Sequence, residues 1–172
     1  MFRRPSPRDA FTNLAARIAT HVRDDGFTPT ALDGLTLLGY AGRSVRQPEV
    51  YEPSLVFVAQ GEKTAHLEDR IIDYGAGHYL VQAMPVPFEC ETHVDPAEPL
   101  LGAAVRIDAD MLAELVAEMP EPDDTASTQG LPMAAVSVTP AIEHALARLL
   151  DCLADPAAAN LPAFGLQRQT IL

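Results

Sequence analysis

Short runs of alternating apolar and polar residues dominate the chain between positions 35 and 107. Glycine, proline or aspartate separates most of these runs, and no stretch of helical periodicity interrupts them. Brief connections of this kind argue against a parallel α/β sheet and favour an antiparallel sandwich or barrel. The predicted strands are Leu35–Ala41, Ser54–Gln60, Lys63–Leu67, Arg70–Tyr74, His78–Met84, Phe88–Val94 and Leu100–Ile107.

One amphipathic helix is predicted ahead of the strands. Residues 9–25 carry apolar side chains at helical spacing, with Asp9 as the capping residue and Gly26 as the stop. The same spacing is compatible with packing against a barrel or with docking on a partner helix. Two arginines follow Met1 closely, but no apolar segment comes after them, so the sequence predicts no secretory signal.

Helical periodicity returns after the strands. The stripe Leu112–Met119 predicts a first helix, which Pro120 ends. Residues 120–135 are rich in turn formers and lack an apolar period, so we expect an exposed loop there. A second helix is predicted to begin at Thr139-Pro140, a capping residue followed by proline, and to end near Asp155.

The second helix carries one continuous apolar face. We expect this face to form a dimer surface, or equally to pack on the chain's own barrel, because periodicity cannot separate the two. A third apolar segment begins near Leu161, and the chain stops on Ile171-Leu172 without a helix cap. We therefore expect a helix that continues toward a further domain. The predicted dimer-surface residues are Ile142, Leu146, Leu149, Leu150 and Leu153.

Composition narrows the class of protein. The 172 residues are 48% hydrophobic, which predicts a globular domain, and no apolar run approaches the roughly 18 residues of a membrane span. The net charge is −12 with only twelve basic residues, so this chain alone is expected to bind nucleic acid poorly. The two cysteines fit a reducing cytoplasm, and buried thiols are favoured over a disulfide between them.

Signals for catalysis and for metal binding are weak. His66-Leu67-Glu68 lacks the second histidine of a metal-binding cupin motif, and three or four converging ligands are needed for zinc or iron. Cys90 and His93 stand three residues apart on a predicted strand, so their side chains point to opposite faces. We therefore expect no catalytic residues, no metal ligands and no cofactor.

Strand alternation places a few polar side chains among apolar neighbours. Gln60 shares a face with Val56 and Val58, and Gln82 shares one with Leu80. Arg106 has the strand phase of Leu100, Gly102 and Ala104. Isolated polar groups of this kind orient a ligand in a small-molecule pocket, although they can also reach solvent at strand ends.

The segment from Tyr51 to Lys63, YEPSLVFVAQGEK, resembles the N-terminal domain of one subgroup of AraC-type transcriptional regulators. The likeness continues through Ile72–Val81, Met84–Pro87, Pro99–Leu101 and Arg106–Asp108, and it includes Arg43. It covers roughly residues 40 to 120. One departure is the hairpin Glu68-Asp69, where the family usually has glycine first. A primed turn needs a positive φ at that position.

The resemblance implies a mainly β protein with α-helices, a cupin-like antiparallel barrel (a double-stranded β-helix). One helix precedes the barrel and a helical dimerisation segment follows it. We expect residues 1–30 to form an arm and helix, residues 31–119 the sensing barrel with its first following helix, and residues 120–172 a loop and helical segment. A C-terminal domain with two helix-turn-helix motifs is expected beyond them.

The predicted function is effector sensing and dimerisation in a cytoplasmic transcriptional regulator that is not an enzyme. Its expected partners are a small-molecule effector, a second copy of the chain, and DNA only through the missing domain. The alternatives are a small cupin enzyme, such as an isomerase or dioxygenase, and a protein–protein module without a ligand. Strand phase together with the resemblance selects the ligand-binding residues Arg43, Gln60, Tyr79, Gln82 and Arg106.

Overall fold

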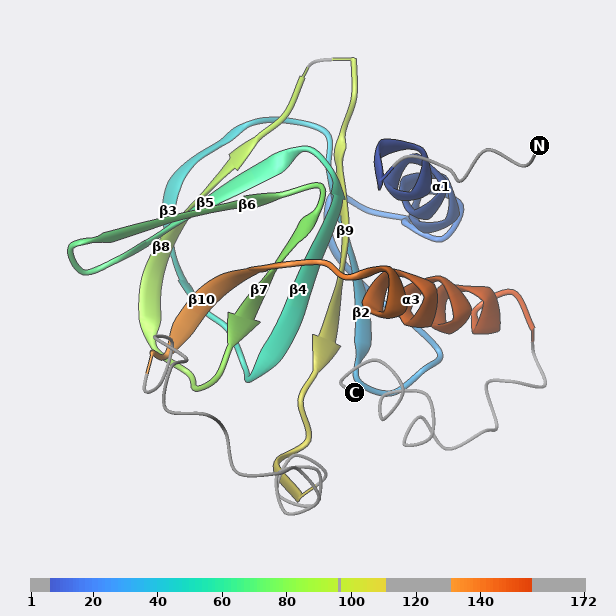
Figure 1. Cartoon of the computed structure of the whole chain (residues 1–172). Helices are drawn as coiled ribbons and strands as arrows, with labels where there is room; N and C mark the ends of the chain where they lie inside the picture. Colours follow the sequence, from blue (N-terminus) through green and yellow to red (C-terminus); the bar gives the residue numbers. More distant parts are fainter. Residues whose placement is uncertain (1–6, 96, 111–130, 156–172) are drawn as a thin grey trace.

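The computed structural model describes residues 7–95, 97–110 and 131–155. Within these ranges, ten antiparallel strands form two facing sheets, and the helices at Pro7–Ala19 and Pro140–Cys152 cover the outer face of the larger sheet (Figure 1). The predicted antiparallel β fold with flanking helices is confirmed. The predicted helix Leu112–Met119 and the segment from Leu161 lie outside the described residues.

The larger sheet has six strands in the order β1-β2-β9-β4-β7-β10. All of its pairings are antiparallel. Its central strands are buried on both faces, which explains why β4 reads as a nearly continuous apolar run. The strands are β1 Gly26–Pro29, β2 Leu35–Tyr40, β9 Leu100–Arg106, β4 Ser54–Gln60, β7 His78–Gln82 and β10 Met133–Ser137.

The smaller sheet has four strands in the order β3-β8-β5-β6, again antiparallel. The chain crosses from the larger sheet to the smaller one at Gly61, between β4 and β5. Gly61 has a φ of +84°, and a Cβ there would lie 3.1 Å from the Cα of Leu100, so only glycine fits this corner. The strands are β3 Ser44–Val50, β8 Pro87–His93, β5 Glu62–Leu67 and β6 Arg70–Gly75.

Two hydrophobic cores divide the molecule into layers. The first lies between the two sheets and includes Val56, Val58, Leu80 and Cys90. The second lies between the larger sheet and the helices α1 (Pro7–Ala19) and α3 (Pro140–Cys152), and we call it the helix-side core. Alternation along each strand of the larger sheet therefore sends successive side chains into different cores.

Three strands were not predicted, namely β1, β3 and β10. Each lies at the edge of its sheet, where one side of the strand has no neighbour. β3 is exposed along most of its length and contains Pro48, so it lacks the apolar alternation that marks a strand. β10 occupies part of the segment 120–135 that was predicted to be a loop, and pairing with β7 decides its conformation.

The helices differ from prediction mainly at their ends. α1 begins at Pro7, not after Asp9, and it ends at Ala19 instead of continuing to position 25. At that end the hydroxyl of Thr20 donates a 2.7 Å hydrogen bond to the carbonyl oxygen of Arg17, which competes with a further helical turn. α3 begins as predicted, with Thr139 accepting a hydrogen bond from the backbone of Ile142.

Candidate functional site

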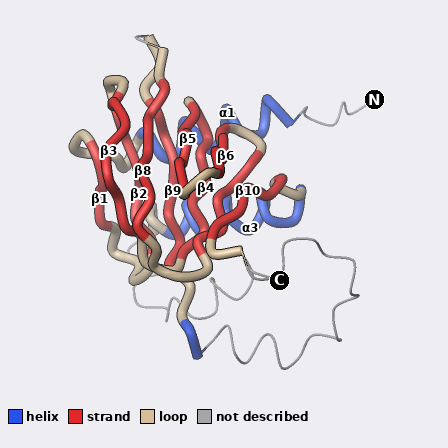
Figure 2. The backbone as a smooth tube through the Cα atoms, turned by 90° about the vertical axis from the view of Figure 1, so that its left-hand side faces the viewer, coloured by secondary structure: helices blue, strands red, loops and turns tan. Residues whose placement is uncertain are grey.

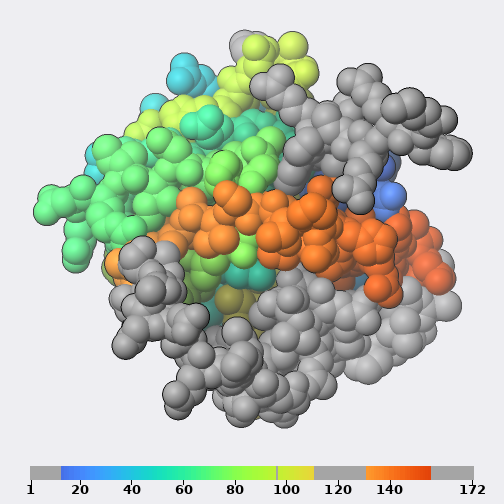
Figure 3. All heavy atoms as spheres, viewed as in Figure 1, coloured from blue at the N-terminus to red at the C-terminus, as the bar shows by residue number. Residues whose placement is uncertain are grey.

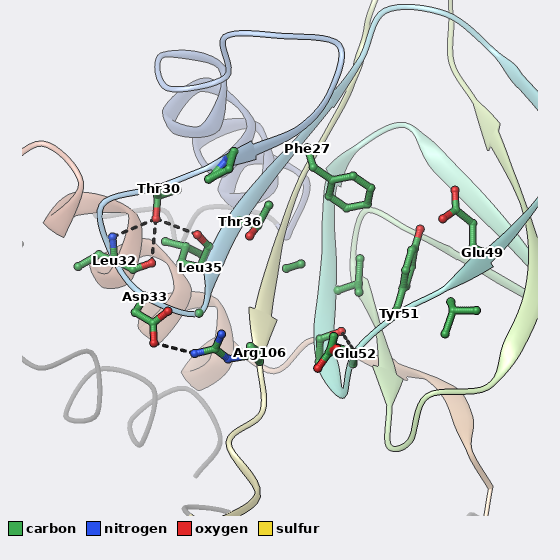
Figure 4. Close-up of a pocket in the computed structure, with 16 residues that line it drawn as sticks. Phe27, Thr30, Leu32, Asp33, Leu35, Thr36, Glu49, Tyr51, Glu52 and Arg106 are labelled. Atoms are coloured by element: carbon green, nitrogen blue, oxygen red, sulfur yellow. Dashed lines mark hydrogen bonds and ion pairs between the residues drawn. The ribbon is translucent and has the colours of Figure 1, made fainter.

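A pocket of about 460 Å³ opens between the edge strands of the two sheets. Phe27 and Pro29 of β1 line one side, and Glu49 and Val50 of β3 line the other. Figure 2 shows these two edges next to each other, and Figure 4 shows the pocket with its lining side chains. The barrel is thus open along the line where β1 and β3 have no strand partner on their outer sides.

The rings of Phe27 and Tyr51 form an aromatic wall of this pocket. Phe27 meets Tyr51 edge to face with ring centres 6.1 Å apart, and it meets Tyr40 in the same way at 6.3 Å. Tyr51 in turn contacts Phe88 of β8 in the smaller sheet, with ring centres 4.9 Å apart. Phe27 is 46% exposed although it is large and apolar, because β1 ends the sheet and nothing described covers it. The ring cluster offers an apolar surface to a ligand.

The outer part of the pocket is polar. Arg106 Nη2 lies 2.6 Å from Oδ2 of Asp33, and both residues line the pocket. The loop that carries Asp33 is held by Thr30, whose hydroxyl accepts from the amide of Leu32 at 3.1 Å and donates to the carbonyl oxygen of Leu35 at 2.8 Å (Figure 4). The pocket thus has an arginine at its edge and an apolar interior.

A group of buried polar side chains lies behind the ring of Tyr51. Lys63 points into the barrel from β5 and is 2% exposed. Its Nζ lies 3.4 Å from the hydroxyl of Tyr51 and 4.8 Å from the centre of the Tyr40 ring. The hydroxyl of Tyr74 lies 3.9 Å from Sγ of Cys90. We call these five residues the inner polar cluster.

Burial sets the protonation of this cluster. Loss of solvent raises the pKa of Tyr40 to about 12, and the nearby carboxylate of Glu49 adds to the rise. Burial raises the pKa of the Tyr51 and Tyr74 phenols further still. It also raises the pKa of the Cys90 thiol, against the opposing effect of the Lys63 ammonium. At neutral pH the three phenols and the thiol therefore keep their protons.

Of the five predicted ligand-binding residues, the structure brings only Arg106 to the pocket wall. Arg43 lies exposed in the connection between β2 and β3, not on a strand. Gln60 donates a 2.8 Å hydrogen bond from Nε2 to the carbonyl oxygen of Pro99, at the barrel end that carries the Gly61 corner. The remaining two residues lie on opposite faces of β7.

Tyr79 faces the helices, where its ring stacks on Phe57 with centres 5.1 Å apart. Gln82 is fully buried and donates a 2.6 Å hydrogen bond to the carbonyl oxygen of Met84. Its Oε1 is buried without a hydrogen-bond partner among the described residues. The prediction grouped Tyr79 with Gln82, but residues three apart on a strand cannot share a face.

Sequence reasoning missed the aromatic wall and the inner polar cluster. Tyr51 and Lys63 were both inside the segment that carries the family resemblance, and the alternation of β5 places Lys63 inward with Ala65 and Leu67. That alternation was a usable signal. Phe27 gave none, because the short strand β1 contains glycine and proline and follows a helix.

The leucine face of α3 packs on the chain's own barrel. Leu146, Leu149 and Leu150 are at most 2% exposed within the helix-side core, and Ile142 and Leu153 pack at its margin. Figure 3 shows β10 and α3 lying across one face of the molecule. This packing is the alternative that the periodicity left open, and a dimer surface on this face stays a prediction. Arg17 of α1 further ties the two helices together through an ion pair with Asp151.

Histidines gather on the outer face of the smaller sheet. His66 Nε2 lies 2.7 Å from Oε1 of Glu91, and Nε2 of His93 lies 3.0 Å from the hydroxyl of Thr64. That hydroxyl also lies 2.6 Å from Oδ1 of Asp73. No group of three or more such side chains within the described ranges is arranged to hold a metal ion. Both cysteines are free thiols, Cys90 buried and Cys152 half-buried.

The family follows from comparison with known sequences. The family model described as the AraC-type transcriptional regulator N-terminus matches residues 31–169. The chain belongs to this family. The match spans both sheets from the loop before β2 onward and continues through α3. No curated protein matches the sequence.

Two solved structures share the fold of this AraC-type domain. The AraC-like transcriptional activator CuxR is 10% identical with a TM-score of 0.54, and the likeness covers 96% of this chain and 64% of CuxR. Apo ToxT K231A from Vibrio cholerae is 8% identical with a TM-score of 0.50, covering 84% of this chain and 55% of ToxT. The chain therefore spans less than two thirds of either protein. No helix in the described part of the domain is long and apolar enough to cross a membrane.

Proposed function

We propose that this AraC-type domain senses a small-molecule effector in the pocket between β1 and β3. The observation that carries the proposal is the pocket itself, about 460 Å³ in volume, with an aromatic wall and an arginine at its edge. Pockets of roughly 300 to 1,000 Å³ with apolar linings and a few polar groups are typical of ligand sites. Arg106 is the predicted residue that the proposal retains in the pocket.

The pocket has a physical connection to the helices. Leu32 and Leu35 line the pocket and also belong to the helix-side core, which holds the leucines of α3. A ligand that moves the loop at Asp33 must therefore repack side chains that touch the helical layer. We infer that effector binding shifts the relative stability of two arrangements of α1 and α3.

The output of this shift lies in the rest of the regulator. We propose that the full protein is a cytoplasmic homodimer, without enzymatic activity, that binds DNA through a separate C-terminal domain. The charge of −12 supports the assignment of DNA binding to another domain. Analytical ultracentrifugation at high micromolar concentration checks for the homodimer, and a strict monomer would contradict it.

A pocket-filling variant tests the sensing function. A library of small molecules is screened for compounds that raise the melting temperature of the wild-type chain. Ala104→Phe places a ring in the pocket, whereas Ala135→Phe places one on the exposed side of β10. The stabilising effect should vanish in Ala104→Phe and persist in Ala135→Phe. A library without any stabilising compound, or with compounds that stabilise both variants equally, would overturn the proposal.

A protein–protein module and a cupin enzyme, the two alternative functions, would each require a different feature of the barrel. A protein–protein module with a collapsed barrel would leave no room for a ligand, whereas the pocket exceeds the roughly 300 Å³ at the lower end of ligand sites. A cupin enzyme would require a metal, and purified protein with stoichiometric iron, manganese or zinc would favour it. Neither has a structural observation in its support comparable to the pocket.

A further inference from the structure

Lys63 is the one lysine of the chain, and it lies in the barrel interior. Its side chain is only 2% exposed, so its ammonium has lost almost all contact with solvent. Lysine is rarely buried to this extent unless it is paired with an opposite charge. A group of opposite charge is therefore expected next to the Lys63 ammonium.

The described residues do not supply that partner. No carboxylate of the described chain lies within ion-pair distance of Lys63. An ammonium has three hydrogen atoms to donate, yet its single hydrogen bond to a described group is the long one to Tyr51 at 3.4 Å. The Tyr40 ring at 4.8 Å adds a cation–π contact but accepts no further hydrogen bond of normal strength. Burial of a charge that is satisfied so incompletely costs folding free energy.

Several side chains around Lys63 carry hydroxyls that can donate hydrogen bonds, and the carboxylate of Glu49 acts on Tyr40 and Tyr51 of the same group. Tyr74 on β6 and Thr92 on β8 lie directly opposite Lys63 on its two neighbouring strands, and Thr92 is 2% exposed. The phenols of Tyr40, Tyr51 and Tyr74 keep their protons at neutral pH because burial raises each pKa. An ammonium with several hydroxyls beside it can donate more hydrogen bonds than it receives, so this group complements an acceptor that carries negative charge.

Tyr51 connects this group to the pocket. Its ring lines the pocket, and its hydroxyl contacts Lys63. Phe27 packs on the same ring from the edge strand β1, and 46% of its surface is exposed. Lys63 itself is not among the residues that line the pocket, so the polar end of a pocket ligand would have to reach it past the Tyr51 hydroxyl.

We propose that the effector is a small carboxylic acid with an apolar body, and that Lys63, together with the Tyr51 hydroxyl, holds its carboxylate. This inference rests on the proposed sensing function and names the ligand class. Glu49 also lines the pocket and carries a negative charge, which an acid must approach. The proposal therefore requires that the carboxylate pass beyond Glu49 to the donor-rich interior, where charge-assisted hydrogen bonds are strong.

Matched fragments test the ligand class directly. Each set consists of a carboxylate, a primary amide and an amine on the same aromatic or aliphatic body, for example 3-phenylpropanoate, 3-phenylpropanamide and 3-phenylpropylamine. Binding to the wild-type chain is measured by calorimetry. We expect the acids to bind at least tenfold more tightly than the amides and the amines. Equal or tighter binding of amides or amines would overturn this inference and leave the sensing function intact.

The variant Lys63→Met then separates a ligand anchor from a structural lysine. It keeps an unbranched side chain of similar length without the charge, and Arg70→Met removes an exposed charge from β6 as the matched control. We expect Lys63→Met to lose the preference for acids and to have a melting temperature, without ligand, equal to or above that of the wild-type chain. Arg70→Met should retain the preference for acids. An unchanged preference in Lys63→Met, or a large fall in its melting temperature, would contradict the assignment.

Two further outcomes keep the two proposals distinguishable. If the small-molecule library yields pocket ligands but no acid among them, only the assignment of Lys63 fails. If no compound binds in the pocket at all, the sensing function fails and this inference fails with it. Should Lys63→Met not fold, Tyr51→Phe removes the second donor while keeping the ring, and a preference for acids that it leaves undiminished would count against the site. The comparison of head groups on the wild-type chain requires no variant.

Discussion

The side-chain amide of Gln60 donates a 2.8 Å hydrogen bond to the carbonyl oxygen of Pro99. This contact joins the end of β4 to the connection that leads into β9, next to the corner at Gly61. Gln60 was predicted to orient a ligand, and the structure instead gives it a role in holding the chain reversal. Its position at the end of the strand, away from the pocket, decides the difference.

Gln60→Ala should therefore lower stability without changing effector binding. Loss of one hydrogen bond of this kind costs about 1 kcal/mol. In a domain of this size that corresponds to a fall in melting temperature of about 2–4 °C, which thermal denaturation measures. Gln47→Ala, at an exposed position on β3, is the matched control and should change little. A loss of ligand binding at full stability would instead favour the original prediction.

The backbone of Glu68, in the hairpin between β5 and β6, is strained in a way that a substitution can relieve. Glu68 has a φ of +53°, while its neighbour Asp69 does not have a positive φ, which is the sign pattern of a type II′ turn. Non-glycine residues are disfavoured there. Glu68→Gly should raise stability by about 0.5 kcal/mol, since relief of strain exceeds the entropy that glycine loses. Asp69→Gly should give no gain, and denaturant melts of both variants measure the contrast.

Leu149→Ala should destabilise the single chain. Leu149 is 2% exposed in the helix-side core, and truncation of a buried leucine costs about 2–5 kcal/mol. Leu153→Ala, at the margin of the same core, should cost less. Thermal melts and sedimentation are measured on the same samples. If Leu149→Ala dissociated a dimer while the melting temperature stayed constant, α3 would be a subunit interface after all.

The tyrosines predict the behaviour of the chain at alkaline pH. All four have a raised pKa, chiefly because they are buried, with Tyr40 at about 12. A group with a raised pKa in the folded state contributes stability below its unfolded pKa of about 10 and loses it as pH rises further. Stability should thus fall from about pH 10 upward.

Two spectra recorded during one alkaline titration check this expectation. The ultraviolet absorbance of phenolate reports ionisation, and far-ultraviolet circular dichroism reports folding. Because the inner polar cluster cannot ionise without exposure to solvent, most of the phenolate signal should appear together with unfolding. Full ionisation of the tyrosines near pH 10 in a chain that stays folded would show that the cluster is open to water.

Seven of the ten strands in the described residues could be predicted, and six of these seven are paired on both sides. Burial imposes an apolar pattern on such strands, as in β4 and β9. The edge strands β1 and β3 have an outer side without a partner, so their sequences carry charges, proline and glycine in place of that pattern. The pocket lies between those two edges, which is why the sequence pointed to only one of the residues that line it.

The sequence by itself determined the positions of the central strands along the chain, their antiparallel nature, the start of α3, and the family. Local spacing and punctuation encode these features, since each depends on residues close together in the chain. The tertiary structure alone decided that Phe27, Tyr51 and Lys63, from β1, the β3–β4 connection and β5, meet at one opening. It also decided that the leucines of α3 cover the chain's own sheet. Both depend on which surfaces come together when distant strands pair. Periodicity along a single segment predicts an apolar face but does not identify the surface that packs on it.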